Sequence, residues 1–224
     1  MGAAVLWKQF ESILGAPPGW QARREPERAP TGIAEIDSAT GGLPRGCLTE
    51  IVGPASSGRT SLLLGVLAAA TARQEACALV DAEDAFSPHS AAGAGVQLAR
   101  LLWVRCGHSA EHALKAADLL IQGGGFGLVI MDLGDTEPRT ARRISLASWF
   151  RLRRAVEHTP AVLVSVARQS NAGTCASLVI ECGRRSTTWS GARSVSRLLR
   201  SFEVRAQSTD RRKPCTPVFT ARAI

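Results

Sequence analysis

Short runs of continuously apolar residues alternate with longer helical patterns along the middle of the chain. Each run has the length of a strand buried on both faces, and the segments between the runs have helical periodicity. The predicted strands are 47–52, 76–81, 101–105, 127–132 and 161–166. The predicted helices are 61–72, 109–121 and 140–157. This alternation is typical of an α/β fold, with a mainly parallel sheet flanked by helices.

The pattern changes after residue 167, where the helical segments stop. Apolar runs at 177–182, 200–206 and 216–222 predict further strands, which we expect to be antiparallel. The whole pattern therefore predicts a parallel α/β core followed by C-terminal antiparallel strands.

The first thirty residues differ from the rest. Residues 3–15 have the spacing of an amphipathic helix, and its apolar side consists of Leu6, Phe10, Ile13 and Leu14. The next segment is rich in proline and arginine, which is typical of a linker. We therefore expect a helix at 1–15, a linker at 16–30 and one core domain at 31–224. Leu6, Phe10 and Ile13 are candidate contacts to a docking surface, either on the same domain or on a neighbouring protomer.

Charge is unevenly distributed along the chain. The formal net charge is +8, but residues 1–138 hold 10 Lys or Arg against 15 Asp or Glu, and residues 139–224 hold 17 against 4. A strongly basic C-terminal part favours a polyanion or an acidic partner. A general enrichment in arginine is the alternative explanation, since only three lysines are present.

Cysteine usage and hydropathy favour the cytoplasm. The six cysteines form no C-x-x-C pair, so we expect buried free thiols in a reducing compartment. No run approaches the ~20 apolar residues of a membrane span. The N-terminus lacks the basic start, long apolar stretch and small-residue cleavage site of a secretory signal. We therefore expect a cytoplasmic protein without a membrane partner.

Residues 53–60 read Gly-Pro-Ala-Ser-Ser-Gly-Arg-Thr and lie between a predicted strand and a predicted helix. This is the context of a phosphate-binding P-loop, G-x-x-x-x-G-K-[ST], except that Arg59 stands where the motif has lysine. Backbone N–H groups of such a loop converge on an anion at the helix N-terminus. The candidate nucleotide-binding residues are Gly53, Ser56, Ser57, Gly58, Arg59, Thr60 and Ser61. ATP is the expected nucleotide, and because arginine is planar and bulkier than lysine we expect weak or no hydrolysis.

Carboxylates at the ends of two predicted strands are candidates for chemistry at this loop. Asp132 has the position of an acid that holds Mg²⁺, together with the Thr60 hydroxyl. Glu83 closely follows the strand 76–81, and active sites in open α/β sheets lie at the carboxyl ends of strands. Glu83 is therefore a candidate general base. The alternative is that Asp81 and Glu83 are loop acids that cap the following helix.

The predicted helix 140–157 is cationic and contains two aromatic residues, Trp149 and Phe150. Its basic residues are Arg142, Arg143, Arg151, Arg153 and Arg154. Arginines interleaved with aromatic rings are able to contact nucleic acid. The same pattern fits a surface for a protein partner, or a solvated helix whose aromatic residues pack inward. The sequence leaves these three interpretations open.

Together, these features resemble the RecA recombinase family. The stretch with T-G-I-A-E-I-D and G-G-L-P-R-G-C-L-T-E-I-V-G-P-A-S-S-G-R-T is similar to the start of that family's ATPase core. The segment V-D-A-E-D-A-F-S-P resembles the catalytic-glutamate segment, which implies that role for Glu83, and the strand ending at Asp132 resembles Walker B. The pattern at 201–219 resembles the last core strands. This resemblance implies that Arg211 and Lys213 reach the nucleotide of a neighbouring protomer in a homo-oligomer.

The chain also departs from that family. Arg59 replaces the P-loop lysine, and the two mobile DNA-binding loops would fall near 133–141 and 166–177, where the chain is short. The resemblance implies that Gln169 senses the γ-phosphate, or that Arg168 takes its place.

A RecA-like core with an altered ATP site and shortened DNA loops is similar to the ImuA family of accessory proteins. This resemblance implies SOS mutagenesis and translesion synthesis, through contacts with RecA or with an ImuB-type homologue of Y-family polymerases, and with at most weak DNA binding. The alternative is a DNA-dependent ATPase of the recombinase class, which Thr60, Glu83 and Asp132 favour. A cell-division inhibitor related to the same accessory family is a third interpretation.

Overall fold

The computed structural model describes residues 26–190, 198–210 and 216–222. The expected N-terminal helix with Leu6, Phe10 and Ile13, and the basic pair Arg211 and Lys213, lie outside the described residues.

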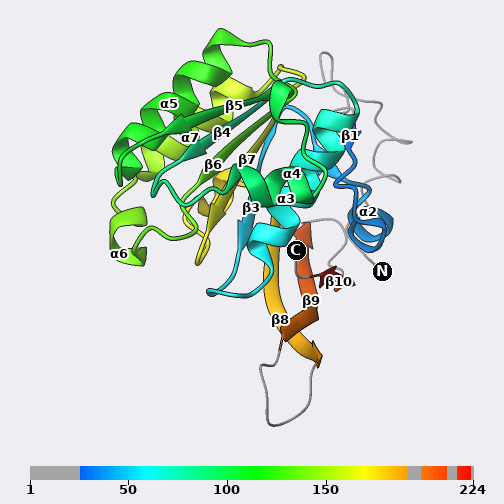
Figure 1. The fold of residues 1–224 in the computed structure, drawn as a ribbon. Coiled ribbons are helices and arrows are strands. Elements are labelled where there is room, and N and C mark those ends of the chain that lie inside the picture. Colours follow the sequence, from blue (N-terminus) through cyan, green and yellow to red (C-terminus); the bar gives the residue numbers. More distant parts are fainter. Residues whose placement is uncertain (1–25, 191–197, 211–215, 223–224) are drawn as a thin grey trace, which may run out of the picture.

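One eight-stranded sheet forms the centre of the described chain, with helices on both of its faces (Figure 1). The parallel strands are β3 (Cys47–Val52), β4 (Cys77–Asp81), β5 (Leu101–Arg105), β6 (Leu128–Asp132), β7 (Val162–Ala167) and β8 (Leu178–Ser190). The antiparallel strands are β9 (Leu198–Asp210) and β10 (Val218–Arg222). The strand order is β10-β9-β8-β3-β7-β6-β4-β5. The predicted α/β fold with C-terminal antiparallel strands is thus confirmed.

Helices cover the two faces of the sheet in two groups. One face packs against α2 (Ala34–Thr40), α3 (Arg59–Ala72) and α4 (Pro88–Gly93). The other packs against α5 (Ala110–Gly123) and α7 (Leu146–Val156). All residues of β4 and β7 are buried, which explains their continuously apolar sequences. Shorter elements are α6 (Pro138–Ala141), the 3₁₀ helices η1 (Leu98–Arg100) and η2 (Gly173–Cys175), and the two-stranded sheet of β1 (Arg28–Ala29) and β2 (Leu43–Pro44).

The prediction of a single helix at 140–157 is wrong, because the chain there forms α6 and α7 with a break between them. Ser145 has extended backbone angles, and its side chain accepts a hydrogen bond from the Ser148 N–H at 3.2 Å. This N-cap starts α7 at Leu146 and separates it from α6.

β8 and β9 form a hairpin that is longer than the predicted strands 177–182 and 200–206. Each strand has 13 residues, and only the first part of β8 pairs with β3, at positions 178–181. The rest of the hairpin extends beyond the parallel sheet (Figure 1). The outer part of β8, residues 184–190, is mostly polar, so the apolar run at 177–182 could not reveal it, whereas the run predicted at 200–206 lies in the outer part of β9.

The region expected to be a linker contributes to the folded unit at its end. Arg28 and Ala29 pair with Pro44 and Leu43, and Ala29 belongs to the hydrophobic core. The five described cysteines are free and four of them are buried, as predicted. Within the part of the chain that the structure describes, no helix is long and apolar enough to cross a membrane.

Candidate functional site

The predicted P-loop connects the end of β3 to the start of α3. Gly53 has φ 154°, and a Cβ there would lie 2.3 Å from the Cys182 carbonyl oxygen and 2.6 Å from Ser57 Oγ. Only glycine fits this approach to β8. Gly58 has φ 97° and is the N-cap of α3, so the loop turns directly into the helix.

This turn leaves polar groups available to an anion. The first N–H groups of α3 have no intrahelical acceptor, and its first turn contains no acidic residue. The Ser57 hydroxyl is 2% exposed, and within the described residues it has no hydrogen-bond partner. A buried hydroxyl without a partner is costly, so the loop is suited to a ligand that supplies acceptors.

The side chain of Arg59 points toward the segment after β6. The residue is 7% exposed, and its Nη1 donates to the Gly134 carbonyl at 3.0 Å. A Cβ at Gly134 would lie 2.9 Å from Asp132 Oδ1 and 3.3 Å from Arg59 Nη1, so the carboxylate and the guanidinium flank the same small space. Glycine at 134 makes room for this arrangement.

Charges in this space perturb one another. Burial lowers the pKa of the Arg59 guanidinium, and the carboxylates of Asp132 and Asp135 offset only part of that effect. Burial raises the pKa of Asp132 to about 6, although the Gly134 N–H donates to its Oδ1 at 2.8 Å and Arg59 favours its charged form. The end of β6 is therefore a confined site where a carboxylate and a guanidinium are both poorly solvated.

The arrangement does not favour the predicted Mg²⁺ ligands. Asp132 ends β6 as expected, and Thr60 lies exposed in the first turn of α3. Among the described residues, no group of three or more His, Cys, Asp or Glu side chains could hold a metal ion. A hydrated cation beside Asp132 would have to share its space with the Arg59 guanidinium. The P-loop therefore fits an anion, and the positive charge of Arg59 disfavours a divalent cation beside Asp132.

Glu83 is held by two side chains. Its Oε1 accepts from Thr136 Oγ1 at 2.7 Å, and its Oε2 lies 3.1 Å from His108 Nδ1. The side chain is 23% exposed, so water still reaches the carboxylate. Each carboxylate oxygen keeps a second lone pair, so these contacts orient Glu83 and leave it able to accept a further hydrogen bond.

Asp81 has a structural role. It is 1% exposed and accepts from the Phe86 N–H at 2.9 Å, the Ala85 N–H at 3.2 Å and Trp103 Nε1 at 3.2 Å. The helix that follows is capped by Ser87 and not by either acid. Asp81 therefore fixes the turn that carries Glu83.

The two sensor candidates point in different directions. Arg168 follows β7 next to the P-loop, and its Nε donates to the Gly134 carbonyl at 3.4 Å. Gln169 instead accepts from Arg142 Nη2 at 2.9 Å. Arg168 is thus the candidate that lies beside Arg59, because both guanidinium groups approach one carbonyl.

Glu50 is a site residue that the sequence analysis missed. It lies on β3 with 0% exposure and accepts from Ser170 Oγ at 2.5 Å, from the Asn171 N–H at 2.8 Å and from the Ala172 N–H at 3.0 Å. These bonds fix the segment after β7, which begins with Arg168. A carboxylate in the middle of an otherwise apolar strand was the signal that could have identified it.

The arginines of the predicted basic face differ in their exposure and in their partners. Arg142, Arg143, Arg151 and Arg154 are exposed and Arg153 is half-buried. Arg151 pairs with Asp118 of α5 at 3.3 Å, which offsets part of the positive charge. Trp149 packs fully inward, whereas Phe150 is 40% exposed beside the arginines.

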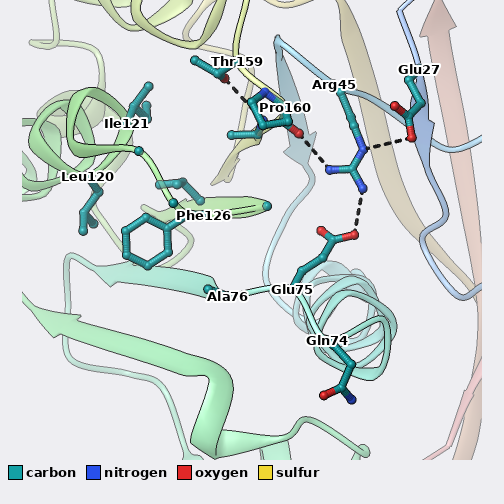
Figure 2. A pocket seen from close by; sticks show the side chains of 15 residues that line it. Glu27, Arg45, Gln74, Glu75, Ala76, Leu120, Ile121, Phe126, Thr159 and Pro160 are labelled. Carbon is teal, nitrogen blue, oxygen red and sulfur yellow. Dashed lines mark hydrogen bonds and ion pairs between the residues drawn. The ribbon is translucent and has the colours of Figure 1, made fainter.

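A pocket lies elsewhere, at the opposite ends of the strands (Figure 2). It has a volume of about 530 Å³ and an apolar wall that includes Leu120, Ile121 and Phe126. Its polar wall contains Arg45, which donates to the Pro160 carbonyl at 2.8 Å. The P-loop and its acids take no part in this pocket.

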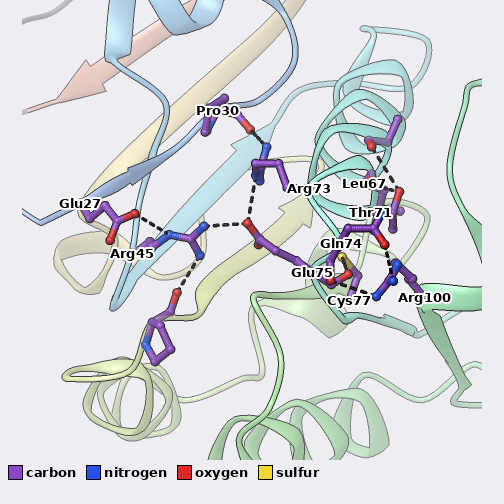
Figure 3. A network of polar contacts seen from close by, with 12 residues as sticks. Glu27, Pro30, Arg45, Leu67, Thr71, Arg73, Gln74, Glu75, Cys77 and Arg100 are labelled. Carbon is purple, nitrogen blue, oxygen red and sulfur yellow. Dashed lines mark hydrogen bonds and ion pairs between the residues drawn. The ribbon is translucent and has the colours of Figure 1, made fainter.

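The polar wall is an ion-pair network whose charges are already matched (Figure 3). Glu75 Oε1 accepts from Arg45 at 2.7 Å and from Arg73 at 2.9 Å, and Glu27 lies 3.7 Å from Arg45. Burial pushes the pKa of Glu75 upward, but the two arginines outweigh burial, and the pKa is lowered. This network ties β1, the start of β3 and the end of α3 together, which is a structural role.

Comparison with known proteins identifies relatives of this chain. The family model of the RecA N-terminal domain matches residues 12–139, more than half of the chain. Protein RecA of Methylococcus capsulatus is 44% identical over 113 residues, which are 50% of this chain and 32% of that protein. Protein RecA of Rhodospirillum rubrum is 44% identical over 108 residues, which are 47% of this chain and 29% of that protein. The crystal structure of the RadB recombinase has a TM-score of 0.63 and 18% identity, and the likeness covers 88% of this chain and 96% of that one.

The similarity in sequence is concentrated in the first part of the core. The matched residues include the P-loop, Glu83 and Asp132, and they end before α7 and the β8–β9 hairpin. The matched stretch spans about a third of the length of these RecA proteins. The likeness to RadB, at 18% identity, concerns the fold alone.

Proposed function

Since this chain belongs to the RecA N-terminal domain family, we propose that it is a RecA-like accessory protein of DNA damage tolerance that acts by docking. Its partner would be RecA, an ImuB-type homologue of Y-family polymerases, or both, in SOS mutagenesis and translesion synthesis. The proposal is based on the resemblance between this altered core and the ImuA family.

The observation that carries the proposal is the position of Arg59. A P-loop lysine is a flexible point charge that reaches the β- and γ-phosphates. The Arg59 guanidinium is instead buried and held by the Gly134 carbonyl at 3.0 Å. We therefore expect ATP turnover near background, which leaves the fold to serve partner binding.

The proposed contacts to partners come from two parts of the chain. The apolar side of the N-terminal segment, with Leu6, Phe10 and Ile13, would dock on an adjacent RecA-like protomer. The exposed arginines of α7, with Phe150 among them, would meet DNA or an acidic partner surface.

The test is binding to immobilised RecA by the full-length chain and by a variant that lacks residues 1–15. We expect the truncated chain to bind at least about tenfold more weakly, because apolar anchors carry most of the energy of an interface. Phe10→Ala should reproduce much of the loss, and Gln9→Ala is its matched control. Equal affinity of both chains, with unchanged circular dichroism, would remove the N-terminal docking role.

A DNA-dependent ATPase is the second candidate function. It is favoured by Asp132, which lies at the carboxyl edge of the sheet next to Asp81 in register and near the P-loop. Turnover that single-stranded DNA stimulates would support this second candidate.

A further inference from the structure

Two guanidinium groups approach one backbone carbonyl beside the P-loop. Arg59 Nη1 lies 3.0 Å from the Gly134 oxygen, and Arg168 Nε lies 3.4 Å from the same atom. The charge of Arg168 lowers the pKa of Arg59, as expected for like charges in proximity. A carbonyl oxygen carries only a partial charge and does not neutralise two cations. An anionic ligand in contact with both would relieve their repulsion.

The groups around this pair have unused hydrogen-bonding capacity. Within the described residues, Arg59 Nε and Nη2 have no recorded acceptor and are not sealed from solvent, so both are accessible to a ligand. The Ser57 hydroxyl is buried and has no partner there. The N-terminus of the 14-residue α3 adds free N–H groups on the same side. Three independent sets of donors therefore surround the loop.

The position of the Arg59 guanidinium near Asp132 bears on whether the ligand binds together with a metal ion. Arg59 Nη1 and Asp132 Oδ1 flank the space in front of Gly134, so a guanidinium lies near the acid that was expected to hold a metal ion. A divalent ion bound by Asp132 would add a further positive charge near Arg59 and Arg168, whose like charges already disfavour one another.

We propose that the P-loop binds a nucleoside polyphosphate without a divalent cation, with Arg59 and Arg168 neutralising the phosphates that Mg²⁺ would otherwise bridge. The inference rests on the RecA-like core of the proposed function and on its P-loop being a nucleotide site, but it does not require partner docking. The chain could fail to bind RecA and still bind a nucleotide without Mg²⁺, and it could bind RecA without binding a nucleotide.

The experiment is titration of a fluorescent ADP analogue with the full-length chain, once in excess MgCl₂ and once in excess EDTA. We expect dissociation constants that agree within about threefold in the two conditions. Weakening by more than about tenfold in EDTA would overturn the proposal, and so would the lack of binding in both conditions.

Variants identify the groups that replace the metal. Arg59→Lys should bind the analogue more tightly in MgCl₂ than in EDTA, since the compact ammonium frees the space beside Asp132. Arg168→Met should weaken binding in EDTA by several-fold, and because Arg168 is exposed this variant tests the proposal even if changes at Arg59 disturb folding. Arg100→Met is the matched control, because Arg100 bonds Gln74 away from the loop and should leave both constants unchanged. Equal binding by the Arg168 and Arg100 variants would contradict the role of Arg168.

Competition distinguishes a nucleotide from a bare polyanion. Unlabelled ADP in EDTA should displace the analogue at least as well as pyrophosphate does. More effective displacement by pyrophosphate would show that the loop recognises only phosphate groups and would overturn the nucleoside assignment.

Discussion

Replacing Glu50 tests whether one buried carboxylate organises the segment beside the P-loop. Glu50 accepts three hydrogen bonds, from the Ser170 hydroxyl and from the backbone N–H groups of Asn171 and Ala172, at 2.5 to 3.0 Å. Glu50→Ala leaves these three donors without their acceptor; Ser170 is exposed and is able to turn to water, but Glu50 and Ala172 are buried, so the Ala172 N–H would be left unpaired. Leaving a buried neutral donor without an acceptor costs about 1–3 kcal/mol for each group. The alanine variant no longer has to bury a carboxylate, which offsets part of this cost. We therefore expect the free energy of unfolding to fall by about 3 kcal/mol.

Glu50→Gln should cost less, about 1–2 kcal/mol, because the amide oxygen still accepts from the backbone and the Ser170 hydroxyl is able to reverse its role. Urea unfolding of each variant, followed by circular dichroism, measures these changes. Thr49→Val is the matched control, because the neighbouring Thr49 hydroxyl is buried without a partner within the described residues. Its removal should not destabilise the fold. A Glu50→Ala variant as stable as the wild type, or an alanine loss no larger than the glutamine loss, would refute the reasoning.

Two further predictions concern the loop itself. Because burial raises the pKa of Asp132 from its ordinary 3.8 to about 6, the native state binds more protons than the unfolded state between these values, so stability falls as the pH rises through that window. Relative to Asp132→Asn, the wild type should therefore lose on the order of 2 kcal/mol between about pH 4 and about pH 7, measured by urea unfolding at both pH values, and a pH-independent difference would contradict the assigned pKa. Gly53→Ala should destabilise the protein by about 1–3 kcal/mol in thermal unfolding, since the new Cβ would meet the Cys182 carbonyl. Gly183→Ala, whose Cβ would meet nothing within 4 Å, should be near neutral, and equal effects of the two changes would contradict the steric argument.

The parallel core could be predicted because buried strands leave a direct signal in the sequence. In β4 and β7 every side chain is buried, so their apolar runs are continuous and their ends agree with the prediction to within a residue. The P-loop was equally visible, since its glycines are fixed by local geometry at Gly53 and Gly58.

Features that depend on contacts between distant segments could not be predicted. The long β8–β9 hairpin extends past the apolar runs on which the prediction was based, so the prediction covered 177–182 of β8 and 200–206 of β9 but not the rest of either strand. The break between α6 and α7 depends on one cap at Ser145 inside a helical pattern. The orientation of Arg59 depends on Gly134, which lies 75 residues away in the chain. The sequence could show that arginine replaces lysine, but not that its guanidinium would lie in front of Asp132.

The central claim is that Arg59 has converted a nucleotide-hydrolysing loop into one that does not turn over ATP. The most direct test is steady-state ATP hydrolysis by the full-length chain and by Arg59→Lys, each with Mg²⁺, with and without single-stranded DNA. The account predicts background turnover by the wild-type chain under both conditions, and a measurable rate for Arg59→Lys if the remaining acids are positioned for chemistry. Turnover by the wild-type chain that single-stranded DNA stimulates would contradict the claim and would favour a recombinase-type ATPase.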